Sequence, residues 1–378
     1  MMNEYTMKIL EYDKLKENIK QYAISEPAKA MLDILQPSVD LPEIKRWMLE
    51  TTEARRITDI NANIPLTAME KISEVMGKAG KGYTLTADEL TAVKDLLESV
   101  RKLKKFMGPM QTVSPIVASY ALSMSELPHL HDEIDRCVVN GLINDRATPE
   151  LSRVRKKIAV TDERIKQKLG SILSSPSYAN VIQEAVVTVR NGRYAIPVKR
   201  EYKKSFAGNV LDLSSSGSTL FIEPATIARL QEDLNVLKME EEKEVFRILS
   251  FLTKMVEADI REISIDVEAF IQYDFIFAKA KYSRSLDCSP AALNEQNKII
   301  IKGGRHPLIG NNAVPLDFAI GDGYRALIIT GPNTGGKTVA LKTMGLLTLM
   351  AQSGLHVPAG EGSELAVFTG ILADIGDG

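Results

Sequence analysis

Cysteine is almost absent from this sequence of 378 residues, which contains only Cys137 and Cys288. These two cysteines are far apart and form no CxxC pair. The sequence therefore excludes a disulfide scaffold and a cysteine-ligated zinc site. Such sparse cysteine is typical of a reducing compartment, and we expect a cytoplasmic protein.

Long apolar runs and an excess of one charge are also missing. No segment approaches the ~18 apolar residues of a membrane-spanning helix, and the first 14 residues lack the apolar centre of a signal peptide. We expect no membrane partner. Lys and Arg total 47 against 49 Asp and Glu, a net charge of −2. Any basic surface for nucleic acid must therefore be local.

The composition is otherwise that of a globular protein, with 44% hydrophobic and 25% charged residues. Up to about residue 150, prolines separate segments of helical periodicity. One such segment runs from Leu41 to Thr58, and another begins at Ala87, where the hydroxyl of Thr86 can cap it. We predict a helical core domain over residues 1–150.

The pattern changes at Leu151, where apolar residues begin to recur every three or four positions. A second helical pattern runs from Pro224 to about Tyr282 without a further Pro or any Gly. At ~1.5 Å per residue, roughly 58 residues would form a rod of about 85 Å. We predict a lever arm of long paired helices over residues 151–285. The predicted seam of the first helix consists of Leu151, Val154, Ile158, Thr161, Ile165, Lys168 and Ile172.

Residues 184–223, between the two helices, have strand character. Asn191-Gly192 between two apolar segments predicts a tight hairpin. Two further strands are expected at Phe206–Leu213 and Ser218–Ile222. We predict a small β clamp module at the tip of the arm.

The clamp carries six positive charges within 15 residues, opposed only by Glu201. Such a cluster at the end of an arm favours contacts to nucleic-acid phosphates, although strands exposed to solvent also carry lysine. The predicted nucleic-acid-binding residues are Arg190, Arg193, Lys199, Arg200, Lys203 and Lys204.

A phosphate-binding motif lies in the last segment. An apolar strand is expected at Ala326–Thr330, a glycine-rich loop follows it, and a helix is expected through Met350. In this context the loop predicts ATP binding, since its backbone N–H groups and the helix N-terminus favour an anion. Lys337 would reach the β- and γ-phosphates, and Thr338 would bind Mg²⁺. The predicted cofactor-binding residues are Gly331, Pro332, Asn333, Thr334, Gly335, Gly336, Lys337 and Thr338.

A catalytic set for ATP hydrolysis is incomplete in this sequence. The nearest candidate for a Walker B carboxylate is Asp374, at the end of an apolar run. Ile375 follows it, where a second carboxylate is usual. We therefore predict nucleotide binding without a complete catalytic site.

Several strings resemble the MutS ATPases, in particular their second bacterial branch, MutS-two. The phosphate loop and the upstream string Gly304-Arg305-His306-Pro307-Leu308 carry the resemblance to the family. The resemblance to the branch rests on Thr334–Val339, Ser214–Pro224 (SSSGSTLFIEP), Val189–Lys199 (VRNGRYAIPVK), Asp274–Ala280 (DFIFAKA) and Ala373–Asp377 (ADIGD).

The resemblance implies a helical core and long paired-helix arm with a small β clamp module, followed by a partial α/β P-loop (ABC-type) ATPase domain at 286–378. It also implies ATP and Mg²⁺ as cofactors and a homodimer. Similar proteins suppress homologous recombination on branched or mismatched DNA, split collided ribosomes through rRNA contacts, and carry an Smr endonuclease domain. We expect this chain to be an N-terminal fragment truncated after the P-loop.

Two alternatives stay open at this point. One is another coiled-coil ABC ATPase of the SMC type, which is disfavoured because such chains place the phosphate loop before the arm. The other is an interaction module that binds nucleotide without hydrolysing it. The sequence does not decide whether DNA or the ribosome is the main partner.

Overall fold

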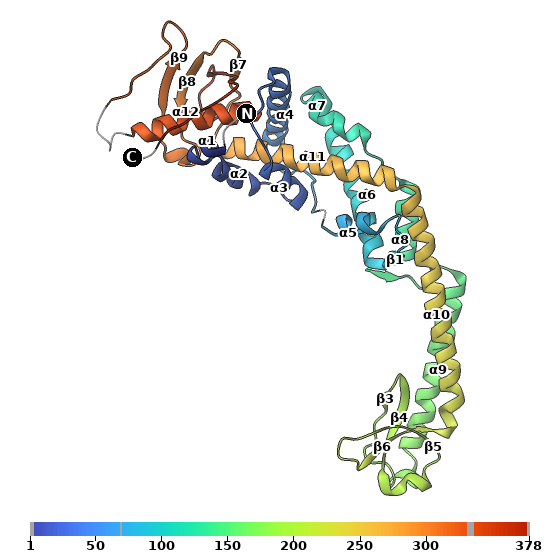
Figure 1. Cartoon of the computed structure of the whole chain (residues 1–378). Helices are drawn as coiled ribbons and strands as arrows, with labels where there is room; N and C mark the ends of the chain where they lie inside the picture. Colours follow the sequence, from blue (N-terminus) through green and yellow to red (C-terminus); the bar gives the residue numbers. More distant parts are fainter. Residues whose placement is uncertain (1–3, 69, 331–335, 376–378) are drawn as a thin grey trace. The chain divides into compact units, whose positions relative to one another are not determined.

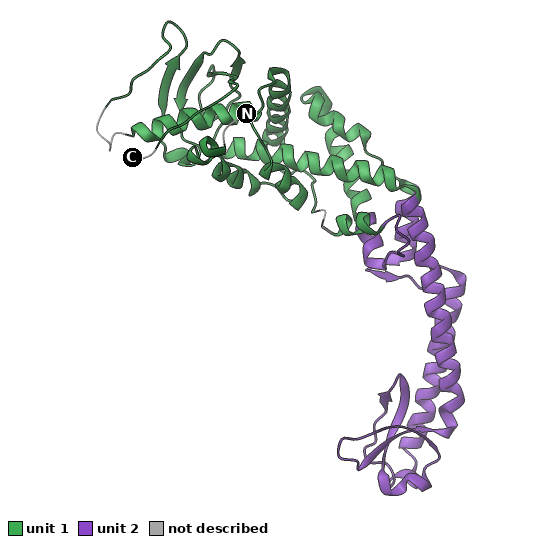
Figure 2. Ribbon diagram, in the orientation of Figure 1, with its two compact units in different colours: residues 1–78, 95–128, 258–378 green, residues 79–94, 129–257 purple. Residues whose placement is uncertain are grey.

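The structure, a computed structural model, describes residues 4–68, 70–330 and 336–375. The chain forms two compact units (Figure 2), each assembled from segments far apart in the sequence. Unit 1 comprises residues 1–78, 95–128 and 258–378, and unit 2 comprises residues 79–94 and 129–257. Among the helices described, none is long and apolar enough to cross a membrane.

Unit 1 is built around the helix α11 (Ile260–Ser285), half of whose residues are buried. It packs on α4, α3 and α2 (Figure 1). The unit ends in a small sheet and the helix α12 (Lys337–Gln352). The other helices of this unit are α1 (Glu4–Ile9), α2 (Tyr12–Lys20), α3 (Glu26–Asp33), α4 (Leu41–Ile60), α5 (Glu70–Lys78), η1 (Gly108–Thr112), α7 (Pro115–Ser119), η2 (Tyr120–Ser123) and η5 (Gly310–Asn312).

A single carboxylate fixes α11 to the N-terminal helices. Asp274 of α11 accepts hydrogen bonds from the backbone N–H groups of Ile24, at 3.0 Å, and Ser25, at 2.7 Å. The Ser25 hydroxyl donates to the same carboxylate at 2.7 Å and also caps α3. Asp274 is buried, so these donors replace the hydrogen bonds that water would otherwise make to its carboxylate.

The two helices predicted in the first 150 residues are confirmed. α4 begins after Asp40, whose carboxylate accepts from the backbone N–H of Glu43. α6 (Ala87–Met107), which contributes residues to both units, begins with a capping box. There the Thr86 hydroxyl accepts from the Glu89 N–H, and the Glu89 carboxylate accepts from the Thr86 N–H.

Unit 2 contains α9 (Pro149–Leu173) and α10 (Ala225–Ala258), which lie side by side (Figure 1). Arg155 of α9 donates to Glu241 of α10 at 2.7 Å, and the hydroxyl of Thr148 donates to Glu244 at the same distance. The remaining elements of unit 2 are α8 (Pro128–Cys137), β1 (Val138–Val139), β2 (Leu142–Ile143), η3 (Pro176–Tyr178) and the tip sheet.

The predicted seam of α9 is confirmed except at one position. Lys168 is exposed, and Leu169 takes the buried position instead. Beside the seam, Arg155 donates to Glu241, and Asp162 accepts from the Tyr194 hydroxyl. The other predicted positions are buried or half-buried: Leu151, Val154, Ile158, Thr161, Ile165 and Ile172.

The long helical pattern expected from Pro224 to about Tyr282 is present, but it forms two helices. Pro224 ends the strand β6, and α10 begins at Ala225. The helix is interrupted at Asp259, with φ −102° and ψ 16°, and α11 begins at the next residue. The interruption falls where the chain passes from unit 2 to unit 1, so α10 and α11 bury their apolar residues in different cores.

The tip sheet of unit 2 is antiparallel, in the order β3-β4-β6-β5. Asn191 and Gly192, at φ 52° and 74°, form the predicted tight turn between β3 and β4. Arg200–Ser205 forms the short helix η4, and the apolar core beneath the sheet includes Ile196, Ile222 and Leu234. The strands are β3 (Thr188–Arg190), β4 (Arg193–Lys199), β5 (Gly208–Leu213) and β6 (Thr219–Pro224).

The sheet of unit 1 has the order β7-β10-β8-β9. The strand expected at Lys298–Ile301 is confirmed as part of β8, whereas 326–330 forms no strand. Leu327 and Ile328 are 47% and 86% exposed, because no neighbouring strand pairs with them in the part of the chain described. The strands are β7 (Ala292–Asn294), β8 (Ile299–Gly304), β9 (Leu316–Ile320) and β10 (Glu364–Ala366).

We predict that Asp266 makes unit 1 less stable as the pH rises. This fully buried carboxyl accepts from the Ser125 N–H, and burial raises its pKa to about 7. The folded state therefore keeps a proton that the unfolded chain releases near pH 4, so the free energy of unfolding should fall between about pH 4 and pH 7, by roughly 4 kcal/mol. Urea unfolding at pH 5 and pH 8 measures this loss.

The matched variant is Asp266→Asn, which keeps the acceptor for Ser125 but does not titrate. It should lose less stability than the parent chain over the same pH range. An equal loss in both proteins would contradict the assignment to Asp266.

Candidate functional site

The predicted phosphate loop leads into the first turn of α12, and the structure describes this motif from Gly336 onward. Gly336 precedes the helix at φ 78°, a left-handed conformation that favours glycine, and open space surrounds the position of its missing Cβ. The N–H groups of Thr338 and Val339, in the first turn, have no carbonyl partner within the helix. Their partial positive charge makes this end of α12 a site that attracts anions.

The other end of α12 is held firmly. Gln352 donates to the carbonyls of Ser38, at 2.8 Å, and Phe368, at 3.0 Å, and accepts from the Phe368 N–H. The hydroxyls of Ser353 and Tyr12 share a hydrogen bond of 2.6 Å. The helix is thus anchored at its C-terminal end, while its first turn is open to a ligand.

A cavity of about 620 Å³ adjoins this first turn. Thr338, Val339 and Lys342 of α12 form one wall, and Leu308 and Ile309 lie opposite. The remaining lining residues come from α2 and the residues around it: Glu11, Lys14, Glu17 and Asn18, together with His306.

The charged groups of this cavity are mutually paired. Lys342 forms an ion pair with Glu11 at 3.1 Å, and hydrogen bonds from Lys14 and then Lys342 hold the pKa of Glu11 below its usual range. Burial lowers the pKa of His306, whose Nδ1 accepts from the Leu308 N–H. His306 is therefore neutral near pH 7 and holds its own loop through this hydrogen bond.

Only three of the eight predicted cofactor-binding residues lie within the described part of the chain. Gly331, Pro332, Asn333, Thr334 and Gly335 lie outside the described residues. Gly336, Lys337 and Thr338 are consecutive at the N-terminus of α12, with Thr338 exposed. Their roles toward ATP and Mg²⁺ stay predictions.

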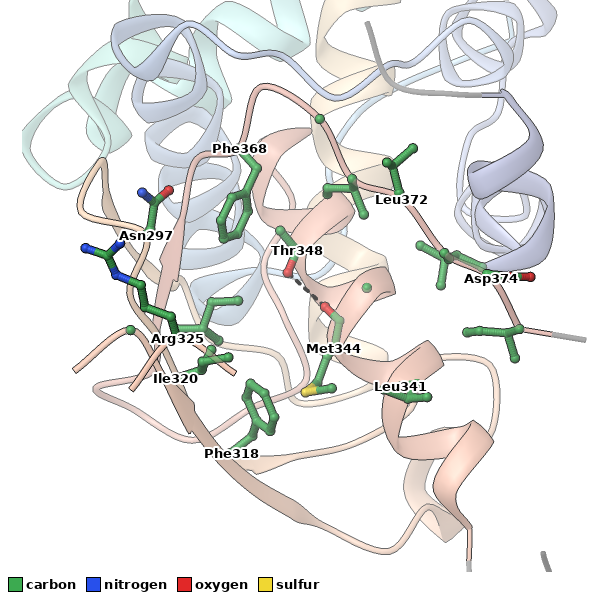
Figure 3. A pocket seen from close by; sticks show the side chains of 18 of the residues that line it. Asn297, Phe318, Ile320, Arg325, Leu341, Met344, Thr348, Phe368, Leu372 and Asp374 are labelled. Carbon is green, nitrogen blue, oxygen red and sulfur yellow. Dashed lines mark hydrogen bonds between the residues drawn. The ribbon is translucent and has the colours of Figure 1, made fainter. Parts of the chain in front are cut away.

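Asp374, the weak candidate for a Walker B carboxylate, is not on a strand. It lines a second cavity, of about 780 Å³, on the other side of α12. Figure 3 shows Phe318 and Ile320 of the sheet facing Met344 of the helix, whereas the Asp374 carboxylate points away from them. Apolar side chains of α12, Leu341 and Met344, line this cavity together with the polar side chains of Asn297 and Arg325.

The segment after α12 adds a strand to the sheet of unit 1. Leu365 lies in β10, which pairs in parallel with β7 and antiparallel with β8. Its side chain is fully buried, so the exposed apolar surface of this region comes from other residues, such as Ile328 and Leu372.

Two of the six predicted phosphate-binding residues of the tip have acidic partners. Arg193 forms an ion pair at 3.0 Å with Glu223, whose side chain is fully buried. Arg190 lies 4.0 Å from the centre of the Phe221 ring and pairs with Asp212 at 3.3 Å. These two guanidinium groups hold the sheet together across β3, β4, β5 and β6.

The other four basic residues cluster at the junction of β4 and η4. Lys199 is half-buried, and Arg200, Lys203 and Lys204 are exposed. The Arg200 guanidinium donates to the carbonyl of Gly217 at 3.2 Å, which places it beside the turn between β5 and β6. The exposed cluster is therefore smaller than the sequence indicated.

Sequence reasoning missed two acidic partners, Glu223 in the tip sheet and Glu11 in the cavity beside the first turn of α12. Glu223 gave a weak signal, as a single acid at the end of the apolar strand Leu220-Phe221-Ile222. Glu11 gave none, since it reaches Lys342 from 331 positions away in the sequence. Neither pairing follows from local pattern.

Comparisons with known proteins agree with these features. Residues 327–378 match the family model described as MutS domain V. The chain is 39% identical over 380 residues to Endonuclease MutS2 of Halalkalibacterium halodurans, which covers 99% of this chain and 48% of that protein. Endonuclease MutS2 of a Geobacillus species is 39% identical, with 100% of this chain and 49% of that protein covered. The chain spans about half the length of the curated relatives it matches.

The helical architecture, the glycine-preceded helix and these matches together define a protein of the MutS class. Since the relatives matched over the whole chain are MutS2 proteins, the chain belongs to the MutS2 family. The resemblance that the sequence strings carried is confirmed.

We predict that Arg193→Ala destabilises the tip sheet by about 3–5 kcal/mol, because it leaves a buried carboxylate without its partner. Hydrogen–deuterium exchange of β4 and β6, together with urea unfolding, measures the change. Arg190→Ala is the matched control, since its ion pair with Asp212 is partly exposed and should contribute less. Equal effects of the two substitutions would contradict the role given to Glu223.

Proposed function

We propose that this chain is the nucleotide-binding and clamp-bearing part of an ATP-dependent MutS2 clamp that holds nucleic acid. The observation that carries the proposal is the open N-terminus of α12, beginning at Gly336 and rigidly held at its other end. The GxxxxGKT motif ends at Thr338, in the first turn of α12. A cavity of about 620 Å³, larger than a phosphate group needs, adjoins this turn.

The described residues fit a nucleotide and its metal ion. The N–H groups of the first turn would receive a phosphate, and the Lys337 ammonium would add positive charge beside it. The exposed Thr338 hydroxyl is the group that would bind Mg²⁺, which neutralises phosphate charge when bound. The cavity between α2 and α12, lined by Leu308 and Ile309, would take the nucleoside.

The domain organisation proposed for this function follows the sequence prediction. It comprises a helical core (1–150), a lever arm of paired helices (151–285) with a clamp at 184–223, and part of an ABC-type ATPase domain (286–378). Ion pairs such as Arg155–Glu241 support the pairing of α9 with α10. The apolar side chains of Leu341 and Met344 that line the second cavity support a larger ATPase domain, in which further segments of the whole protein cover α12.

The clamp would contact phosphates without reading sequence. Arg200, Lys203 and Lys204 are exposed donors with long reach at the tip. The residues 184–223 include no helix longer than the six-residue η4, so no recognition helix is available to enter a groove. We propose branched or mismatched DNA, or ribosomal RNA of collided ribosomes, as the nucleic acid.

For the whole protein we propose ATP hydrolysis, endonuclease activity and a homodimer in the cytoplasm, in agreement with the name endonuclease borne by the relatives. Suppression of recombination and splitting of collided ribosomes are the corresponding cellular roles implied by the family resemblance. All of these belong to the whole protein.

A second candidate is a module that binds nucleotide without hydrolysing it. The position of Asp374 favours this candidate for these 378 residues. Asp374 is not on a strand, and its carboxylate points away from α12 (Figure 3). The two candidates differ in turnover but share the nucleotide site.

We predict that the chain binds ATP with Mg²⁺ and that Lys337→Ala weakens this binding at least tenfold, since charge-assisted bonds to phosphate contribute about 1.5–3 kcal/mol. Isothermal titration calorimetry measures the affinity, and Lys105→Ala, an exposed lysine of α6, is the control. Unchanged affinity in Lys337→Ala would overturn the nucleotide site. Phosphate release near 1 s⁻¹ that Lys337→Ala abolishes would overturn the second candidate.

We also predict that the tip binds nucleic acid with a strong salt dependence. If Arg200, Lys203 and Lys204 each contact one phosphate, replacing all three with Ala should flatten the log–log salt slope on duplex DNA by about 2.7, from ~0.9 per contact. Fluorescence anisotropy with duplex DNA, branched DNA and structured RNA at several salt concentrations measures the slope.

The control for this experiment is Lys243→Ala, an exposed lysine of α10 outside the tip. It should leave the slope unchanged, and the triple variant should weaken all sequences alike. A triple variant with the slope of the parent chain would show that these residues form an ordinary solvent-exposed face.

A further inference from the structure

Unit 1 contains a cavity that the proposed nucleotide and nucleic-acid sites do not use. Its volume is about 480 Å³, within the usual range for sites that bind small organic molecules. Residues of α3, α4, η2 and α11 line it. All of these belong to unit 1, and none of them lines the cavity beside Thr338.

The feature that distinguishes this cavity is a buried lysine. Lys279 of α11 is only 2% exposed, and its ammonium lies 4.7 Å from the centre of the Phe275 ring, which lines the same cavity. Among the described residues, no carboxylate or carbonyl forms an ion pair or hydrogen bond with this ammonium. A buried cation that lacks an anionic partner is costly.

The nearby carboxylate is already engaged. Glu50, 4% exposed, accepts a hydrogen bond of 2.7 Å from the Tyr120 hydroxyl. Arg46, exposed on α4, adds a second positive charge to the lining. Two cations therefore face the cavity against one carboxylate, and the surplus charge is positive.

The rest of the lining is apolar and partly aromatic. Trp47 and Phe275 contribute rings, and Met31 and Leu35 contribute aliphatic side chains. Such a lining accommodates the body of an organic molecule, whereas a bare inorganic ion would leave this apolar surface uncovered.

We propose that this cavity binds a small organic anion, a carboxylate or a phosphate monoester with an aromatic or aliphatic body. The anionic group pairs with the Lys279 ammonium, and the body lies against Trp47 and Phe275. Burial lowers the pKa of free Lys279 to about 8, so the lysine is still mainly protonated at neutral pH and the bound anion strengthens that charge.

The chain provides its own reporter for the test, because Trp47 is its single tryptophan. We expect saturable changes in Trp47 fluorescence on titration with 3-phenylpropionate and with phenyl phosphate, and calorimetry should give matching affinities. The neutral amide 3-phenylpropionamide, of the same shape, should bind at least tenfold more weakly. Comparison of 3-phenylpropionate with phenyl phosphate shows whether the cavity binds a carboxylate or a phosphate group more tightly.

Lys279→Met should weaken binding of both anions at least tenfold while leaving the midpoint of thermal unfolding unchanged or higher, since it replaces a buried charge with an apolar chain of similar length. Lys281→Met, two positions further along the same helix and outside the cavity lining, is the matched control and should bind like the parent chain.

Three results would overturn the proposal: no saturable binding of either anion up to millimolar concentration, equal affinity for the amide and the acids, or undiminished binding in Lys279→Met. Should Lys279→Met fail to fold, the comparison of acid with amide on the parent chain still decides the matter.

Discussion

The carboxylate of Asp274 is the interaction on which most of unit 1 depends. It joins α11 to the start of α3, across 249 positions of sequence, through donors that are buried with it. Once α11 is held there, its following turns carry Lys279 and Ser283 into the interior. Ser283 shares a 2.9 Å hydrogen bond with His356, whose other ring nitrogen bonds the Thr52 hydroxyl of α4.

These contacts connect the central helix to the loop that follows α12. Burial lowers the pKa of His356 to about 4, so this histidine is neutral and serves as a bridge between two hydroxyl groups. Thr51 adds a hydrogen bond of 2.7 Å to the carbonyl of Gly354. The C-terminal end of α12 is consequently fixed by the same core that Asp274 organises, and the open first turn of α12 is positioned from that end.

The tip of unit 2 shows how one kind of residue takes two roles. Arg190 and Arg193 stand near Lys203 and Lys204 in sequence, yet the two arginines are occupied by acidic partners and an aromatic ring. A guanidinium group suits such partners because it is planar and presents several donors. In the tip, the charges of Arg200, Lys203 and Lys204 around η4 stay exposed.

The sequence by itself determined the local elements of this MutS2 chain. The turn at Asn191-Gly192, the capped starts of α4 and α6, and the helix after the glycine-rich loop were all predicted, because turns and caps depend on neighbouring residues. Family membership likewise followed from contiguous strings. Only the tertiary structure decided where the long helix is interrupted, at Asp259, and that residues 326–330 are exposed and form no strand. It also decided that Leu169 is buried in place of Lys168, and that Arg193 pairs with Glu223. It also brought Lys279 into a cavity lined from four separate elements. Burial and charge pairing arise between segments distant in sequence, and no local pattern specifies which segments meet.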